Sequence, residues 1–308
     1  MNVSAPPVHA LPVLVESRRR LREVREGLRA EGRVVAFVPT MGALHEGHRV
    51  LIRHARERAD AVIVSIFLNP RQFRPGEDFD RYPRTLDTDL EICRAEGVDV
   101  VFAPDRDEMY PHEPWVTVEP GPMADVLEGE RRPGHFNGVL LVVLKLFNSV
   151  LPDIAMFGEK DAQQLAVIRR MVTDLDVPVA IEAVPTVRDG DGLALSSRNA
   201  HLSPAERDSA LSLVRALRAG QAESERGPRA VLEAGRRVLE DAAALDPPVK
   251  TDYLELVEPH TFESVTAEAT GPAVLAVAAT VGITRLIDNV HVVLGGAPPA
   301  GGPAGDGA

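Results

Sequence analysis

Cysteine and long hydrophobic runs are nearly absent from this chain. Its single cysteine, Cys93, excludes an intramolecular disulfide and a metal cluster built from cysteines. Its longest apolar run, residues 139–151, is interrupted by Lys145 and Asn148 and is too short to span a bilayer. The N-terminus has no basic region ahead of an apolar block, so no signal peptide is expected. These absences predict a cytoplasmic protein with no membrane partner.

Lysine is also scarce. Of 34 basic residues only three are lysines, Lys145, Lys160 and Lys250. The net charge is -12, and the most basic stretch, ESRRRLREVREGLR, alternates in sign as a solvated helix face does. We therefore expect no nucleic acid partner. Lys160 is the candidate for a site that needs a compact point charge, although its presence could also reflect chance.

Several common site motifs are missing. The chain has no Gly-Lys dipeptide and hence no Walker-type phosphate loop, and it has no G-x-G-x-x-G fingerprint. The histidines of HEGH are three residues apart, whereas the H-E-x-x-H zinc motif needs four. No G-x-S-x-G nucleophile elbow is present.

The order of predicted strands and helices indicates an α/β fold. Over the first 190 residues, β-branched strands alternate with amphipathic helices, which favours a Rossmann-like, doubly wound parallel sheet covered on both faces. The strands are expected in RVVAFVP, DAVIVSIFL, VDVVFAP, DIAMFG and VPVAIEAVPTVR. The length of 308 residues and the later change in pattern suggest a second domain, with two helices and three short strands. We predict a nucleotide- and substrate-binding domain at 1–188, a smaller α+β domain acting as a lid at 189–294, and a disordered low-complexity tail at 295–308.

The stretch PTMGALHEGH joins the first of these strands to a helix. Gly42 and Gly47 would let the backbone approach a ligand, and the helix start would offer unpaired N–H groups to a phosphate. A histidine placed there tends to stay neutral and to donate one hydrogen bond, so His45 and His48 could stabilise charge at a phosphorus centre under attack. Alternatively, His45 only caps the turn and His48 heads the apolar stripe of the helix.

The stretch FGEKDAQQL also joins a strand to a helix. Lys160 would lie in the turn, and Asp161 could bind a ligand or act as the N-cap of the helix. Gln164 falls on the same predicted face as Ile168 and Leu175, so its amide is expected to point inward and to need a partner. A third stretch, DGLALSSRN, places two serines and an arginine in a flexible loop that could hold phosphate oxygens or could merely start the next helix.

Together these segments resemble the pantothenate synthetase (pantoate–β-alanine ligase) family. PTMGALHEGH, NPRQF, YPRT, RRPGHFNGV, FGEKDAQQL, PTVR and DGLALSSRN occur in that family's order and spacing, and TDYLEL and TRLIDN extend the match toward the C-terminus. The resemblance implies an AMP-forming ligase of the HIGH-type nucleotidyltransferase superfamily. Such an enzyme condenses (R)-pantoate with β-alanine through a pantoyl adenylate, uses ATP and Mg²⁺, works in coenzyme A biosynthesis and is usually a homodimer.

The resemblance also implies roles for particular residues. Those implied to act in catalysis are His48 as proton donor, His45, Lys160, Ser196, Ser197 and Arg198. Those implied to bind ATP are Met41, Gly42, Ala43, Leu44, His45, Glu46, Gly47, His48, Gly158, Glu159, Lys160, Asp161, Val187, Leu195, Ser196, Ser197 and Arg198. Gln72 and Gln164 would bind pantoate, and Gln72 would also bind β-alanine. The chain departs from the family pattern at Arg71, Ala162 and Leu195.

Two other functions remain open at this point. One is an adenylyltransferase of the same fold with a different acceptor, against which the two glutamines and RRPGHF argue. The other is a nucleotide-binding module without activity, which the intact His48, Lys160 and Arg198 disfavour.

Overall fold

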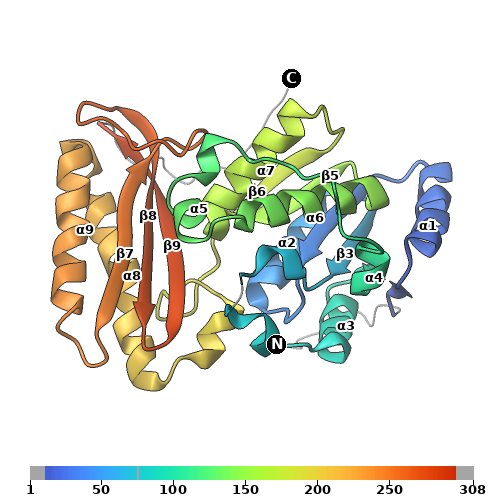
Figure 1. Ribbon diagram of the computed structural model, residues 1–308, viewed down its shortest axis with the longest axis horizontal. Helices are drawn as coiled ribbons and strands as arrows, with labels where there is room; N and C mark the ends of the chain where they lie inside the picture. Colours follow the sequence, from blue (N-terminus) through green and yellow to red (C-terminus); the bar gives the residue numbers. More distant parts are fainter. Residues whose placement is uncertain (1–10, 75, 296–308) are drawn as a thin grey trace, which may run out of the picture. The chain divides into compact units, whose positions relative to one another are not determined.

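The computed structural model describes residues 11–74 and 76–295 and divides the chain into two compact units, Met1–Val187 and Arg188–Ala308 (Figure 1). The division falls one residue before the predicted domain boundary. Residues 296–308, which hold nearly all of the predicted tail, lie outside the described part of the chain.

The first unit is built on a six-stranded sheet in the order β1-β4-β3-β2-β5-β6, and every pairing in it is parallel. This confirms the predicted doubly wound α/β fold. The strands are β1 (Val13–Val15), β2 (Val35–Thr40), β3 (Ala61–Ile66), β4 (Val100–Phe102), β5 (Ile154–Gly158) and β6 (Ala180–Val184). From β2 the chain continues to β3 and β4 on one side, whereas β5 and β6 lie on the other side. The sheet therefore has its topological switch point between β2 and β5, where ligands of such sheets bind.

Helices connect and cover these strands (Figure 1). The longer ones are α1 (Arg18–Ala30), α2 (Glu46–Arg58), α3 (Leu86–Ala95), α6 (His135–Val150) and α7 (Ala162–Asp174), and the one-turn helices are α4 (Arg106–Met109) and α5 (Glu128–Arg131). Helix α2 buries Ile52 and Ala55 against apolar residues of β2 and β3. Helix α6 is buried along most of its length, as its nearly unbroken apolar sequence predicts.

The second unit packs two helices on one antiparallel sheet. Helices α8 (Pro204–Ala222) and α9 (Pro228–Ala242) share an apolar core with β7 (Val249–Val257), β8 (Gly271–Val281) and β9 (Thr284–Leu294). The helices approach closely at Gly220, where a Cβ atom would lie 2.9 Å from the carbonyl oxygen of Val231. The three predicted strands are confirmed, although β8 and β9, with 11 residues each, are not short, because a hairpin turn pairs them over their full length.

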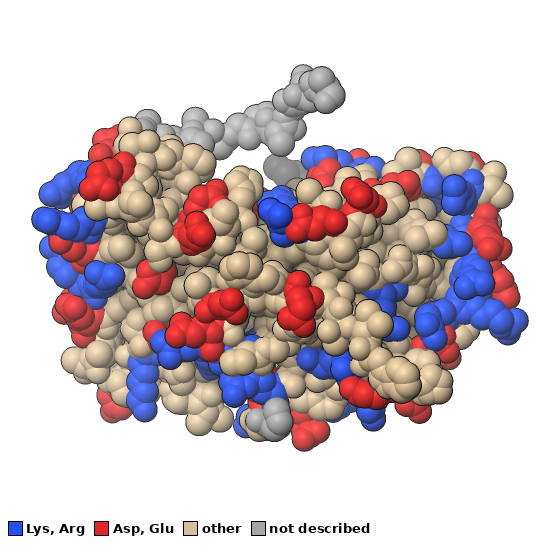
Figure 2. All heavy atoms as spheres, turned by 45° about the horizontal axis from the view of Figure 1, so that its top comes forward, with Lys and Arg blue, Asp and Glu red and all other residues tan. Residues whose placement is uncertain are grey.

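Two surface properties bear on possible partners. Acidic and basic side chains are interspersed over the face shown in Figure 2, consistent with many short-range ion pairs and a net charge of -12. Among the described residues, no helix combines the length and the apolar character needed to cross a membrane.

Candidate functional site

The two predicted phosphate-binding stretches lie beside each other at the switch point. PTMGALHEGH begins at the end of β2, and FGEKDAQQL begins at the end of β5. These strands are direct neighbours, with Ala36 opposite Ile154 and Phe37 opposite Ala155. Because both strands run in the same direction, the turns that follow them emerge at the same edge of the sheet.

The turn formed by residues 41–48 is held by the strand it leaves. Thr40 donates its hydroxyl to the carbonyl of Ser65 (2.7 Å) and accepts from the backbone N–H of Gly42 (3.1 Å). Gly42 has a φ of 84°, and Ala43 also has a positive φ, of 52°. A glycine suits the first of these conformations, whereas alanine adopts the second only where its surroundings enforce it.

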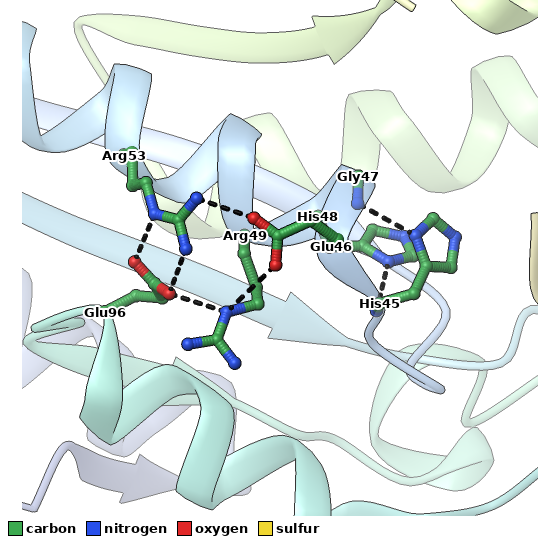
Figure 3. A network of polar contacts seen from close by, with 7 residues as sticks. All are labelled: His45, Glu46, Gly47, His48, Arg49, Arg53 and Glu96. Atoms are coloured by element: carbon green, nitrogen blue, oxygen red, sulfur yellow. Dashed lines mark hydrogen bonds and ion pairs between the residues drawn. The ribbon is translucent and has the colours of Figure 1, made fainter. Parts of the chain in front are cut away.

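His45 and His48 cap helix α2 together (Figure 3). The Nδ1 atom of His45 accepts from the N–H of Gly47 (3.1 Å), and the Nδ1 atom of His48 accepts from the N–H of His45 (3.2 Å). The centroids of the two rings are 4.1 Å apart. Since Nδ1 of His48 accepts, the proton of its neutral imidazole lies on Nε2. The capping role of His45 considered from the sequence is therefore correct, and the geometry leaves His48 with an Nε2–H donor.

His48 is held in its neutral form. Burial lowers its pKa from 6.5 to about 3, and the charges of His45 and Lys160 lower it further. The predicted direction is confirmed, although burial rather than the helix terminus is the largest cause. The effect of Lys160 on His48 also indicates that the two strand-to-helix turns bring these side chains near each other.

Glu46, another predicted ATP-binding residue, directs its side chain away from the histidines (Figure 3). Its carboxylate pairs with Arg53 (2.7 Å), and both Arg53 and Arg49 pair with Glu96 at the end of α3 (2.8 and 2.6 Å). This network fastens the start of α2 to α3. If Glu46 contacts ATP, the contact is therefore expected from its backbone.

Lys160 lies in a short 3-10 helix, Glu159–Asp161, between β5 and α7. Its side chain is mostly buried, and its ammonium is 3.9 Å from the carboxylate of Asp161. Asp161 is exposed and is the N-cap residue of α7, but its side chain makes no capping hydrogen bond. Ala162, one of the departures from the family pattern, is the first residue of α7.

Gln72 is the substrate-binding candidate that the structure places beside the 41–48 turn. Its Nε2 atom donates to the sulfur of Met41 (2.8 Å), and its Oε1 atom accepts from Asn69 (3.1 Å). The neighbouring Arg71 extends to Glu113 (2.7 Å) and lies over the ring of Tyr110. The bulk of Arg71 is thus accommodated away from the amide of Gln72.

The RRPGHF segment holds the backbone of Gln72 in place, a role that the sequence did not indicate. Arg132 and His135 both donate to the carbonyl of Gln72 (3.2 and 2.8 Å), and Arg132 also pairs with Glu77 (2.6 Å). Burial, aided by the charge of Arg132, lowers the pKa of His135 from 6.5 to about 4. A neutral His135 with its proton on Nδ1 matches this donation.

The glutamine of this stretch that the structure shows buried is Gln163, the neighbour of the predicted Gln164. Gln163 is 5% exposed, donates to the carbonyls of Met123 and Val126, and accepts from the N–H of Glu128. Gln164 is only partly buried. Gln164 lies on the helix face of the buried Ile168 and Met171, and the inward direction of its amide stays a prediction. Leu175 is exposed because it follows the last residue of α7, Asp174.

The remaining predicted ATP-binding residues lie on either side of the point in the chain where the two units divide. Val187 is the last residue of the first unit, and Leu195, Ser196, Ser197 and Arg198 belong to the second. Ser196 caps the 3-10 helix Ser197–His201 by accepting from the N–H of Arg198 (3.3 Å). Arg188 anchors the start of this loop by a two-bond ion pair with the buried Asp288 (2.6 and 2.9 Å).

Metal binding by the protein alone has no support in the described part of the chain. There, no group of three or more histidine, cysteine, aspartate or glutamate residues is arranged to hold a metal ion.

Comparison with known proteins gives consistent matches over nearly the whole chain. The family model described as "Pantoate-beta-alanine ligase" matches residues 13–291. A pantothenate synthetase of Thermobifida fusca is 58% identical over 300 residues, which are 96% of this chain and 100% of that protein. One of Saccharopolyspora erythraea is 57% identical over 276 residues, which are 89% of each chain.

Comparison with solved structures gives matches to the same family. The crystal structure of pantothenate synthetase from Thermus thermophilus superposes with a TM-score of 0.83 at 45% identity, covering 90% of this chain and 98% of that one. The pantoate-beta-alanine ligase of Francisella tularensis, described as complexed with beta-gamma ATP and beta-alanine, has a TM-score of 0.75 at 34% identity, with coverages of 91% and 97%.

Proposed function

Because the chain belongs to the pantoate–β-alanine ligase family, we propose that its two strand-to-helix turns at the switch point form the ATP site of that reaction. The chain is thus an enzyme that condenses pantoate with β-alanine using ATP. The observation that carries the assignment of the site is the adjacency of β2 and β5, which gathers His45, His48 and Lys160 at one edge of the sheet.

In the first step, a carboxylate oxygen of pantoate attacks the α-phosphorus of ATP. The new O–P bond forms as the bond to the pyrophosphate oxygen breaks, which gives pantoyl adenylate and pyrophosphate. Negative charge grows on the phosphoryl oxygens, where the Nε2–H of His48 donates a hydrogen bond and the ammonium of Lys160 supplies positive charge. A neutral His48 supplies that donor without adding a second cation beside Lys160.

In the second step, the amine of β-alanine attacks the carbonyl carbon of the adenylate. The C–N bond forms, the C–O bond to AMP breaks, and the amine loses a proton. Gln72 and Gln164 would hold the hydroxyl and carboxylate groups of pantoate, with Gln72 also near β-alanine. Positioning of the two anions and the amine could supply about 7–11 kcal/mol of the barrier reduction.

The other ATP contacts in the proposal come from the resemblance. Gly158, Glu159 and Asp161 would bind the nucleotide, with Asp161 at the ribose, and Val187 would contact adenine through its backbone. Leu195, Ser196, Ser197 and Arg198 would close over the phosphates, and the smaller unit would then act as a lid. Mg²⁺ would enter with ATP, held by phosphate oxygens and water, as this ion commonly is in nucleotide sites. A cytoplasmic location, where ATP is available, is part of the proposal.

A coupled assay tests the reaction and its order. AMP release should require pantoate and β-alanine together, whereas exchange of labelled pyrophosphate into ATP should require pantoate alone. Chelation of Mg²⁺ should stop both, and added Mg²⁺ should restore them. Exchange that ignores pantoate would instead indicate a different acceptor, and absence of turnover with all substrates would exclude the ligase.

We further propose that the enzyme is a homodimer that pairs through the segment around Trp115. The only tryptophan of the chain is 96% exposed, and Val116 beside it is 80% exposed. Residues 110–121 form neither helix nor strand, and the sequence VTVE that follows Trp115 alternates apolar and polar side chains as a pairing strand does. An exposed aromatic of this size is typical of a protein interface.

A double variant, Trp115→Ser with Val116→Ser, should therefore shift the dimer toward monomer by at least tenfold in dissociation constant, since it removes two large apolar contacts from each protomer. Sedimentation velocity would measure this. Ile283→Ser, which changes another apolar side chain that is 82% exposed in the β8–β9 turn, is the matched control and should leave the dimer intact. A wild-type monomer, or a double variant that dimerises as well as Ile283→Ser, would contradict the proposed interface.

A further inference from the structure

A buried carboxylate lies directly against the 41–48 turn. Asp89, from the first turn of α3, is 1% exposed. Its Oδ1 atom accepts from the N–H of Leu44 (2.8 Å), and its Oδ2 atom accepts from the N–H of Ala43 (3.0 Å) and from the hydroxyl of Thr85 (3.3 Å). Helix α3 thereby holds a loop that lies 45 residues away in sequence.

Asp89 makes these contacts without an ion pair to any residue in the described chain. Burial of an unpaired carboxylate is costly, and burial raises the pKa of Asp89 while its hydrogen bonds to Leu44, Ala43 and Thr85 lower it. A core position that needed only bulk would be filled at lower cost by an apolar residue. A carboxylate is needed here because it faces two backbone N–H donors, those of Ala43 and Leu44.

The contacts explain how the turn keeps an unfavourable backbone. Ala43 has a φ of 52°, in the left-handed region that costs a residue with a Cβ atom about 1–2 kcal/mol. At Gly42, an added Cβ atom would lie 3.1 Å from Oδ2 of Asp89, so a side chain there would crowd the carboxylate. The residues that follow this clamped stretch are His45 and the rest of the N-terminus of α2.

We propose that Asp89 is a positioning residue of the ligase reaction. By accepting from Ala43 and Leu44, its carboxylate fixes the 41–48 turn in the conformation that presents the Nε2–H of His48 to the phosphates of ATP. This inference rests on the proposed function, which identifies the bound ligand as ATP.

The nearly isosteric substitution Asp89→Asn distinguishes this role from simple filling of space. Asparagine has one acceptor oxygen and one NH₂ group, so one of the two backbone N–H groups would face another donor. An unsatisfied or opposed buried donor should release the turn. Asp87→Asn is the matched control, because it makes the same chemical change at an exposed position in the first turn of the same helix.

The test measures binding of a non-hydrolysable ATP analogue by calorimetry, together with kcat and the KM for each substrate. Asp89→Asn should weaken analogue binding and lower kcat/KM for ATP by about 10- to 100-fold, the range expected from one buried donor left unsatisfied. The KM for β-alanine should change less than about threefold, since Asp89 contacts Ala43, Leu44 and Thr85, whereas Gln72 meets the turn through the side chain of Met41. Asp87→Asn should match the wild type.

Two results would overturn the inference. One is Asp89→Asn binding the analogue within twofold of Asp87→Asn, and the other is an equal rise in KM for all three substrates, which would indicate a general loosening of the fold. If Asp89→Asn does not fold, hydrogen exchange of the wild type decides: the amides of Ala43 and Leu44 should be protected although they precede α2, and fast exchange at both would refute the clamp.

The same experiment separates this inference from the function on which it rests. Analogue binding needs no pantoate and no turnover. A wild type that makes no pantothenate, yet loses analogue affinity on Asp89→Asn alone, would contradict the proposed function and leave the clamp standing. An active wild type, with equal analogue affinities in Asp89→Asn and Asp87→Asn, would support the proposed function and refute the clamp.

Discussion

Lys160→Ala is expected to slow formation of pantoyl adenylate by about 10²- to 10³-fold, comparable to the loss of one preorganised stabiliser of transition-state charge. The ammonium of Lys160 lies at the end of β5, mostly buried and near enough to His48 to lower its pKa. In the proposed site, substrate anions meet at this point, where the carboxylate of Asp161 lies 3.9 Å from the ammonium. Single-turnover measurement of adenylate formation would detect the loss.

The small number of lysines provides a clean control for this prediction. Lys250→Ala makes the same change at an exposed position on β7 and should leave the rate unchanged. The melting temperature should hardly move in either variant, because the ion pair of Lys160 with the exposed Asp161 is long. A Lys160→Ala enzyme that forms adenylate within a few-fold of the Lys250→Ala enzyme would refute the role.

His48→Ala is the second substitution with a large expected effect, about 10²- to 10³-fold on the same step, because it removes a donor to the phosphoryl oxygens. His54→Ala, in the same helix, is the matched control and should retain activity. Equal losses in the two variants would mean that His48 serves only to cap α2.

The protonation state of His48 can be measured directly. With its pKa lowered from 6.5 to about 3, the imidazole should be neutral throughout pH 5–8, with its proton on Nε2. Nitrogen shifts of the histidine rings by NMR should show this tautomer without titration in that interval. Protonation of His48 at a midpoint near 6.5 would contradict the proposed geometry.

The sign of the corresponding effect on stability follows from linkage. The unfolded chain binds a proton at His48 near pH 6.5, whereas the folded chain does not until the pH approaches about 3. The free energy of unfolding should therefore fall as the pH decreases below about 6.5. His48→Ala should make this dependence shallower, leaving the similar contribution of His135, whose pKa is about 4.

Local sequence was sufficient for the class of fold and for the two strand-to-helix turns that we propose as the ATP site. Runs such as VVAFV and AVIVSI must be buried on both faces, and helical repeats between them require parallel crossovers, so the α/β class follows from periodicity alone. A glycine and a histidine directly after a strand likewise indicate a strand-to-helix turn that can bind phosphate. The order and spacing of the motifs then identified the chemistry, and the comparisons confirm it.

The tertiary structure decided which side chains support that chemistry. The clamp of Asp89 on Ala43 and Leu44 and the donation of His135 to the carbonyl of Gln72 join residues 45 or more positions apart, and no local pattern encodes such contacts. The burial of Gln163 was equally hidden, because its amide meets backbone groups of Met123, Val126 and Glu128, which lie 35 or more positions away. Periodicity determines that a helix has a buried face, whereas the packing of distant segments determines which residue meets a partner there.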